Sequence, residues 1–111
     1  MIEDALFDAM RALRSWAETQ PHVRRLWVFG SRLKGTHHVV SDLDVAMEID
    51  AVGYDESAAV TWVTHHLEWE RTLTPLTGYK VDLNEFDSSN RMSNVVSYIS
   101  CCAALVYARA N

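Results

Sequence analysis

The 111-residue chain is poor in cysteine, with only the two neighbours Cys101 and Cys102. Bridging adjacent cysteines requires a strained geometry, so we expect reduced thiols in a cytoplasm rather than a disulfide framework. The first ten residues, MIEDALFDAM, lack the lysines and arginines of a signal peptide. Long apolar runs are absent too, because the longest, CCAALVYA, is far too short to cross a bilayer. These absences predict a cytoplasmic protein without a membrane span.

Positive charge is also scarce, since 10 Lys and Arg stand against 15 Asp and Glu and give a formal net charge of −5. This balance argues against direct nucleic-acid binding through bulk electrostatics, although it is compatible with a small, locally basic pocket. The chain is 49% hydrophobic and has four tryptophans, which is enough to bury a core without staples. With no visible repeat or low-complexity tract, residues 1–111 are expected to form a single domain.

The apolar periodicity predicts an alternation of helices and strands. Pro21 ends the first helix, Gly30-Ser31 and Gly35 bound a short turn or helix, and Thr74, Pro75 and Gly78 predict a loop. The resulting order, α-β-(α)-β-α-β-α, is an α/β (α+β mixed sheet) fold with a three-stranded mixed sheet core flanked by helices. The predicted helices are 2–19, 55–71 and 89–108, and the predicted strands are 24–29, 42–49 and 80–86. The inner face of helix 55–71 is predicted to carry Ala58, Ala59, Trp62, Val63, His66 and Leu67.

Strand 42–49 has two faces of different chemistry. Successive side chains of a strand point to opposite faces, so Asp42 and Asp44 project together, with Cα atoms about 7 Å apart. In strand 80–86, Asp82 likewise lies on the face opposite Val81 and Leu83. The aliphatic residues that alternate with the aspartates, and that we expect in the core, are Leu43, Val45, Met47 and Ile49.

Three carboxylates facing one cleft repel one another unless a cation or a proton neutralises them. Oxygen ligands favour a hard ion, which predicts Mg²⁺, with Mn²⁺ as a substitute. A Gly-Ser turn beside such a site can offer backbone N–H groups and a hydroxyl to a phosphate, and Gly30 has no side chain to obstruct the approach. Asp42, Asp44, Asp82, Gly30 and Ser31 are therefore the candidate site residues.

This pattern resembles the signature of the DNA-polymerase-β-like nucleotidyltransferase superfamily. Gly30-Ser31 is followed after ten residues by Asp42-x-Asp44, and FGSRLKG, SDLD and VDLNEF are close to the wording of the minimal nucleotidyltransferases. The resemblance covers nearly the whole chain in element order and implies the minimal nucleotidyltransferase fold. The loop Thr36-His37-His38 departs from the acidic or proline-containing loop often found there.

The resemblance implies a metal-dependent enzyme that moves a nucleoside monophosphate, by default AMP from ATP, onto an acceptor hydroxyl and releases pyrophosphate. Asp42 and Asp44 would hold the metal ions, and Asp82 would complete the acceptor-side metal site and help to deprotonate the hydroxyl. The outer phosphates would contact Gly30 and Ser31, with Arg32 and Lys34 as candidates for added charge.

The acceptor is not named by the sequence, and three alternatives stay open. Similar minimal proteins are commonly encoded beside a helical HEPN-type ribonuclease, act as its antitoxin and nucleotidylate it, which favours a protein acceptor or partner. A small-molecule acceptor, as in aminoglycoside nucleotidyltransferases, is the second alternative, and a non-catalytic partner-binding module is the third. The nearly apolar last helix is expected to lie either in the core or under another chain, which could be a second copy in a homo-oligomer. His37-His38 and His65-His66 lack zinc-like spacing, so ordinary neutral histidines are expected.

Overall fold

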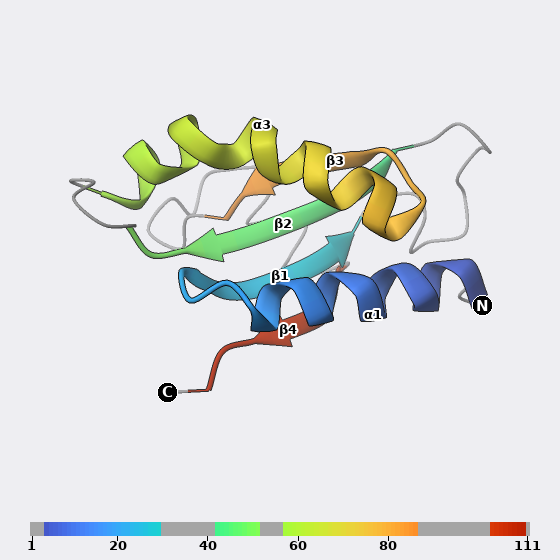
Figure 1. The fold of residues 1–111 in the computed structure, drawn as a ribbon. Helices are drawn as coiled ribbons and strands as arrows, with labels where there is room; N and C mark the ends of the chain where they lie inside the picture. The colour runs from blue at the N-terminus through green and yellow to red at the C-terminus, as the bar shows by residue number, and fades with distance from the viewer. Residues whose placement is uncertain (1–3, 30–41, 52–56, 87–102, 111) are drawn as a thin grey trace.

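The computed structural model describes residues 4–29, 42–51, 57–86 and 103–110 of the chain. Within these ranges lie two helices and four strands (Figure 1). In chain order the elements are α1 (Asp4–Glu18), β1 (Val23–Phe29), β2 (Leu43–Ile49), α3 (Ala58–Thr77), β3 (Val81–Glu85) and β4 (Ala103–Ala108).

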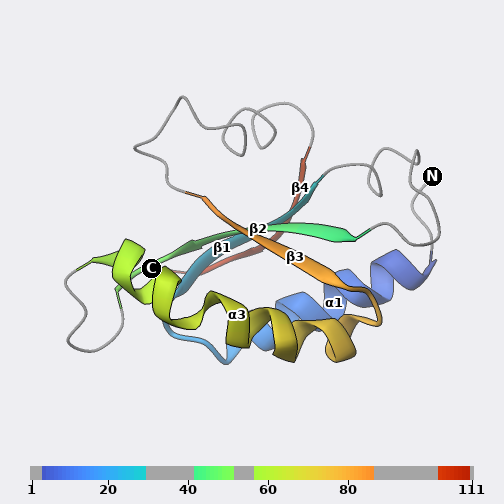
Figure 2. The same cartoon turned by 90° about the horizontal axis from the view of Figure 1, so that it is seen from above.

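The four strands form one mixed sheet in the order β3-β2-β1-β4. Strand β1 is antiparallel to both of its neighbours, whereas β3 runs parallel to β2. Both helices lie on the same face of the sheet, as the view from above shows (Figure 2). This mixed sheet with its flanking helices confirms the predicted fold class.

Two details of the predicted fold are wrong. The described residues contain four sheet strands rather than three, and the additional strand β4 occupies residues 103–108, where the apolar pattern predicts the end of a helix over 89–108. A short apolar run such as AALVYA fits a buried strand as well as a helix, and pairing with β1 makes it a strand. The rest of that predicted helix, residues 89–102, and the short element predicted between Gly30 and Gly35 lie outside the described residues.

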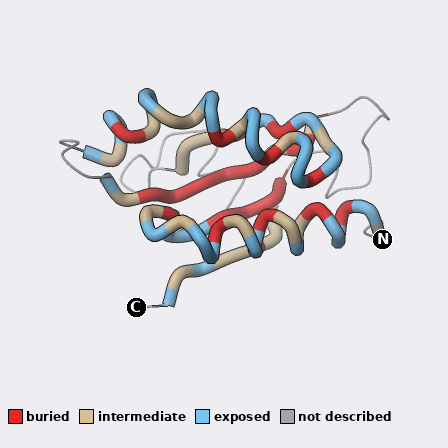
Figure 3. The backbone as a smooth tube through the Cα atoms, in the orientation of Figure 1, coloured by how far each residue is buried: buried red, intermediate tan, exposed pale blue. Residues whose placement is uncertain are grey.

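The main core lies between the sheet and the two helices (Figure 3). The predicted alternation on β2 is confirmed, because its aliphatic side chains all face this core. A second, smaller cluster lies on the opposite face of the sheet and consists of Trp27, Phe29 and Ala46, with Phe86 and Ala103 packed against it. The β2 side chains in the main core are Leu43, Val45, Met47 and Ile49.

Helix α1 buries one stripe, as its periodicity predicts. It ends at Glu18, just before Pro21, and the N–H groups of Thr19 and Gln20 then bond to carbonyls of the last turn. Residues at helical spacing therefore face the sheet while the charged residues between them stay exposed. The buried side chains of α1 are Leu6, Ala9, Leu13 and Ala17.

Helix α3 is longer at its C-terminus than predicted, because it continues through Thr77 and includes Pro75. Its start is capped by Ser57, whose side chain accepts a hydrogen bond from the N–H of Val60. It ends at Gly78, which adopts a φ of 78° and donates its N–H to the carbonyl of Thr74. Glycine suits this left-handed cap, since it carries no Cβ. The predicted loop residues Thr74 and Pro75 are thus helical. Neither described helix is long and apolar enough to span a membrane.

The buried face of α3 also differs from the prediction. Val63 and Leu67, expected inside, are 74% and 57% exposed. Apolar residues occur around most of this helix, so periodicity alone does not identify the face that packs on the sheet. Threonine is tolerated inside, because the Thr77 hydroxyl donates to the Leu73 carbonyl at 2.8 Å. The buried residues are Thr61, Trp69, Leu73 and Thr77.

Candidate functional site

The parallel pairing of β2 with β3 brings Asp44 and Asp82 directly opposite each other. Each aspartate lies between core residues of its own strand, so both side chains project from the face that the helices do not cover. Asp44 is half-buried and Asp82 is exposed. Asp42 immediately precedes β2 and is also half-buried. The three predicted carboxylates therefore lie at one end of the two strands.

The electrostatics of Asp44 show that the carboxylates are crowded. Burial raises the pKa of Asp44 from its usual 3.8 to about 6, and the nearby charge of Asp82, a hydrogen bond with the Asp82 side chain and the charge of Asp42 all act in the same direction. A raised pKa at a carboxyl pair means that a proton shared between the two groups relieves their repulsion. Ionisation of Asp44 is therefore costly in the absence of a cation.

A divalent cation fits the chemistry of this donor set. The side chains offer only oxygen ligands, and burial together with the neighbouring carboxylates disfavours the charged form of Asp44 unless a cation is bound. Among the described residues, however, no three His, Cys, Asp or Glu side chains are arranged as a ready-made metal cage.

The positions of the predicted phosphate-binding residues relative to the aspartates are not described by the structure. Gly30, Ser31, Arg32 and Lys34 lie outside the described residues, as does the His37-His38 pair. The last described residue before them is Phe29, which ends β1 and pairs with Asp44.

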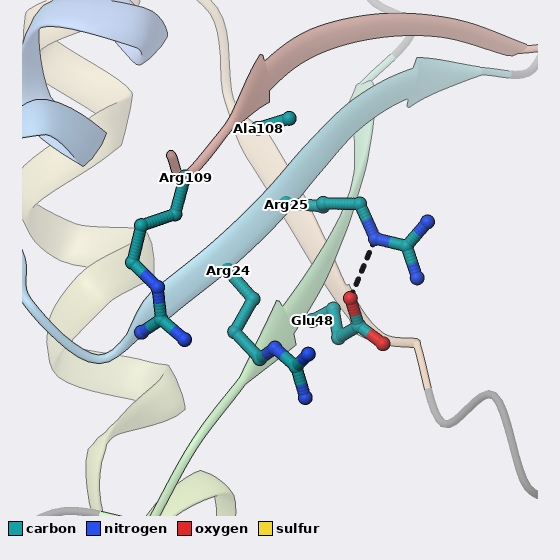
Figure 4. A pocket seen from close by; sticks show the side chains of 5 residues that line it. All are labelled: Arg24, Arg25, Glu48, Ala108 and Arg109. Atoms are coloured by element: carbon teal, nitrogen blue, oxygen red, sulfur yellow. Dashed lines mark hydrogen bonds and ion pairs between the residues drawn. The ribbon is translucent and has the colours of Figure 1, made fainter. Parts of the chain in front are cut away.

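A hollow of about 210 Å³ lies at the opposite end of the sheet from the aspartates (Figure 4). Asp44 and Glu48 are four residues apart on β2, which is about 13 Å along a strand. The register explains why the basic residues gather here: β1 is irregular between Val23 and Arg25, and an extra residue in a strand re-aims its side chains. The lining residues are Arg24, Arg25, Glu48, Ala108 and Arg109.

The guanidinium groups of this hollow already have partners. Arg25 donates to Glu48 at 2.6 Å, and this hydrogen bond raises the pKa of Arg25. The Arg25 guanidinium also lies over the ring of Trp27, 5.1 Å from its centroid. Arg109 lies 2.8 Å from Asp50 and also donates to a backbone carbonyl. The hollow is thus an ion-pair cluster that joins strand ends, separate from the carboxylate site.

The histidines and tryptophans of α3 contact other rings and the helix backbone. His66 Nδ1 lies 2.8 Å from the carbonyl oxygen of Trp62. Trp69 is buried and stacks with His22 and His65, at centroid distances of 4.8 and 5.6 Å. Burial, followed by the charge of His65, lowers the pKa of His22. The lowered pKa favours the neutral form of the His22 imidazole.

Two polar side chains of α3 contact the strand that carries Asp82 and are not predicted by the sequence analysis. Glu70 Oε2 accepts a hydrogen bond from the N–H of Leu83 at 3.0 Å, and Thr74 Oγ1 accepts one from the N–H of Val81 at 3.1 Å. The only signal in the sequence is that the two residues are one helical turn apart, which is too common a spacing to single them out.

Comparisons with known proteins identify the family and the fold. Residues 11–110 match the family model described as polymerase beta, nucleotidyltransferase. No curated protein sequence matches the chain significantly. A crystal structure of a toxin–antitoxin with AMP-PNP has a similar fold, with a TM-score of 0.56, 20% identity, and coverage of 98% of this chain and 75% of that chain. A rebuilt and re-refined structure of a tri-AMPylated Shewanella oneidensis HEPN toxin in complex with MNT antitoxin is also similar, with a TM-score of 0.53, 16% identity, and coverage of 95% and 73%.

Proposed function

Because this chain belongs to the polymerase beta nucleotidyltransferase family, we propose that it transfers AMP from ATP to a hydroxyl group of a partner protein and releases pyrophosphate. The observation that carries the proposal is the cross-strand pair Asp44–Asp82, in which the pKa of Asp44 is raised to about 6. Perturbed carboxyl pairs of this kind are typical of catalytic sites.

Each aspartate has a proposed role. Asp42, Asp44 and Asp82 would hold Mg²⁺, or Mn²⁺ in its place, and the bound ion would neutralise charge on the carboxylates and the triphosphate. Asp82 is the more exposed of the paired acids and would accept the proton of the acceptor hydroxyl. The acceptor oxygen then forms a bond to the α-phosphorus, and the bond from that phosphorus to the pyrophosphate oxygen breaks. The outer phosphates would contact Gly30 and Ser31, with Arg32 and Lys34 adding positive charge.

We propose a helical HEPN-type protein as the acceptor. The support is the fold shared with chains from a toxin–antitoxin crystal structure containing AMP-PNP and from a complex of a tri-AMPylated HEPN toxin with its MNT antitoxin. The exposed apolar side chains Val60, Val63 and Leu67 on α3 are compatible with a partner, since such side chains in a row mark contact surfaces.

The direct test is transfer to the protein encoded by the neighbouring gene. We expect its intact mass to rise by one or more AMP groups on incubation with the chain, ATP and Mg²⁺. Asp44→Asn and Asp82→Asn should abolish the mass shift, whereas Asp8→Asn, an exposed acid on α1, should keep it. Modification that persists in folded Asp44→Asn protein would refute the catalytic assignment. Transfer to an aminoglycoside in place of a protein would make the acceptor a small molecule.

Ligand binding gives a second, acceptor-independent test. ATP with Mg²⁺ at about a hundred times its dissociation constant should stabilise the fold by about 2.7 kcal/mol, and either component alone should do less. Asp44→Asn should weaken this effect more than Asp82→Asn, because Asp82 is assigned to the acceptor side. Unchanged melting with saturating ATP and either Mg²⁺ or Mn²⁺ would mean that the nucleotide site is absent.

A further inference from the structure

Among the described residues, strand β3, which carries Asp82, lies at the edge of the sheet and pairs only with β2. Its hydrogen bonds identify the side that faces β2. The Lys80 carbonyl accepts from the N–H of Leu43, and the N–H of Phe86 donates to the Met47 carbonyl. In a strand, alternate residues direct their N–H and C=O groups to the same side. The even-numbered residues of β3 therefore face β2, and the N–H groups of Val81 and Leu83 point away from the sheet.

Helix α3 supplies hydrogen-bond acceptors for both outward N–H groups. Thr74 Oγ1 accepts from Val81 at 3.1 Å and Glu70 Oε2 accepts from Leu83 at 3.0 Å. The spacing of the two acceptors matches that of the two N–H groups. Glu70 and Thr74 are about 6 Å apart along the helix axis, and two residues of a strand rise about 6.6 Å. The helix thus satisfies an edge that would otherwise be open to water or to another strand.

Asp82 lies between these two anchored residues. On one side of its strand the ladder to β2 sets its register opposite Asp44, and on the other side α3 fixes the residues immediately before and after it. An edge strand held from one side alone can shift or fray, and a displacement of a fraction of an ångström at a catalytic group is costly.

We propose that Glu70 and Thr74 are positioning residues, which hold the edge strand so that the Asp82 carboxylate stays in reach of Asp44. The inference rests on the proposed function only in assigning a catalytic role to Asp82. Neither residue touches the reacting atoms. Glu70 acts through the backbone of Leu83, and Thr74 acts through the backbone of Val81.

In this arrangement each side chain acts through the oxygen atom that accepts the hydrogen bond from the strand. Variants that keep this oxygen but remove the charge therefore distinguish the proposal from a general effect of charge. A carboxylate accepts a stronger hydrogen bond than an amide does, but glutamine keeps an oxygen at the same place. Glu70→Gln should therefore rescue most of what Glu70→Ala loses. At the second position, Thr74→Ser keeps the hydroxyl, whereas Thr74→Val has nearly the same shape without an acceptor.

The experiment compares these variants in the full chain with ATP, Mg²⁺ and the acceptor that is modified by the wild type. We expect Glu70→Ala to lower kcat about tenfold while leaving the KM for ATP within about twofold, because one backbone hydrogen bond is lost and the triphosphate contacts are not. Amide exchange at Leu83, followed by NMR, should become about tenfold faster in the same variant. The control is Glu68→Ala, which removes an exposed acid of the same helix and should change neither quantity.

A wild-type kcat together with wild-type Leu83 exchange in Glu70→Ala would overturn the proposal. An equal loss of kcat in Glu70→Gln and Glu70→Ala would also overturn it, since the charge of Glu70, and not its hydrogen-bonding oxygen, would then be responsible. If the wild-type chain transfers AMP to no acceptor, the proposed function fails. The exchange rates of Val81 and Leu83 alone then decide whether Thr74 and Glu70 hold this strand.

Discussion

Replacing Asp44 by asparagine should make the metal-free protein more stable at pH 8 and leave its stability at pH 4 nearly unchanged. Asp44 has a pKa of about 6 in the folded chain and 3.8 as an ordinary aspartate. Between these values the native state binds one proton more than the unfolded state, so the free energy of unfolding falls as pH rises. The contribution of Asp44 is therefore fully present below pH 4 and lost above pH 6.

The size of the effect follows from the same pKa. The difference of about two pH units corresponds to at most about 3 kcal/mol. Because Asp44 is only half-buried, solvent screening reduces this to about 1–2 kcal/mol. For a chain of this length, 1 kcal/mol corresponds to about 4 °C in Tm. Asparagine cannot ionise, and its amide can donate to Asp82 as the protonated carboxyl of Asp44 does, so the variant keeps the low-pH contact.

The assay is urea denaturation in EDTA at several values between pH 4 and pH 8, with Asp44→Asn, wild type and Asp8→Asn in parallel. Asp8 is an exposed acid on α1, and its replacement should stay within about 0.5 kcal/mol of wild type throughout. Adding Mg²⁺ at pH 8 should stabilise wild type more than Asp44→Asn. A stability difference between Asp44→Asn and wild type that is equal at pH 4 and pH 8 would refute the crowding of these carboxylates.

Two further predictions test helix α3. Leu73→Ala should lower the free energy of unfolding by about 2–5 kcal/mol because Leu73 is fully buried. Leu67→Ala, at an exposed position, should change it by less than about 0.5 kcal/mol. If urea denaturation showed the larger loss for Leu67→Ala, the observed buried face of the helix would be contradicted. Gly78→Ala should cost about 1–2 kcal/mol through its φ of 78° alone, since no described residue other than its chain neighbours has an atom within 4 Å of the added Cβ. An unchanged Tm would contradict this left-handed cap.

The sequence predicts those parts of the fold in which the order of apolar and polar residues is compatible with only one type of secondary structure and one buried face. On β2, strict alternation places Asp44 opposite the core residues, and no other secondary structure separates those two sets. On α3, apolar residues occur on several faces, so the buried stripe depends on tertiary packing, and the prediction of Val63 and Leu67 inside is wrong. Strand β4 was predicted as helix for a related reason: its identity depends on pairing with β1, which is distant in sequence.

The candidate site divides in the same way. Alternation predicts that Asp44 and Asp82 share a face, but only the parallel register of β2 and β3 sets them side by side. The hydrogen bonds from the edge strand to Glu70 and Thr74 depend on how the helix lies along that strand. No local pattern in the sequence predicts this placement.

The paired aspartates and the ion-pair cluster of the hollow lie at opposite ends of the sheet. Asp44 lies half-buried at one end of the strands, where burial, followed by the charges of Asp82 and Asp42, raises its pKa. The opposite end is held by the contact of Arg25 with Glu48 and by that of Arg109 with Asp50. A sheet secured by these ion pairs, and by helices packed along one whole face, can tolerate like charges at the aspartate end, where a cation would relieve them. The ion-pair cluster and the proposed chemistry thus occupy different ends of the same strands, so substitution of Arg25 or Arg109 should affect folding without altering the ionisation of Asp44.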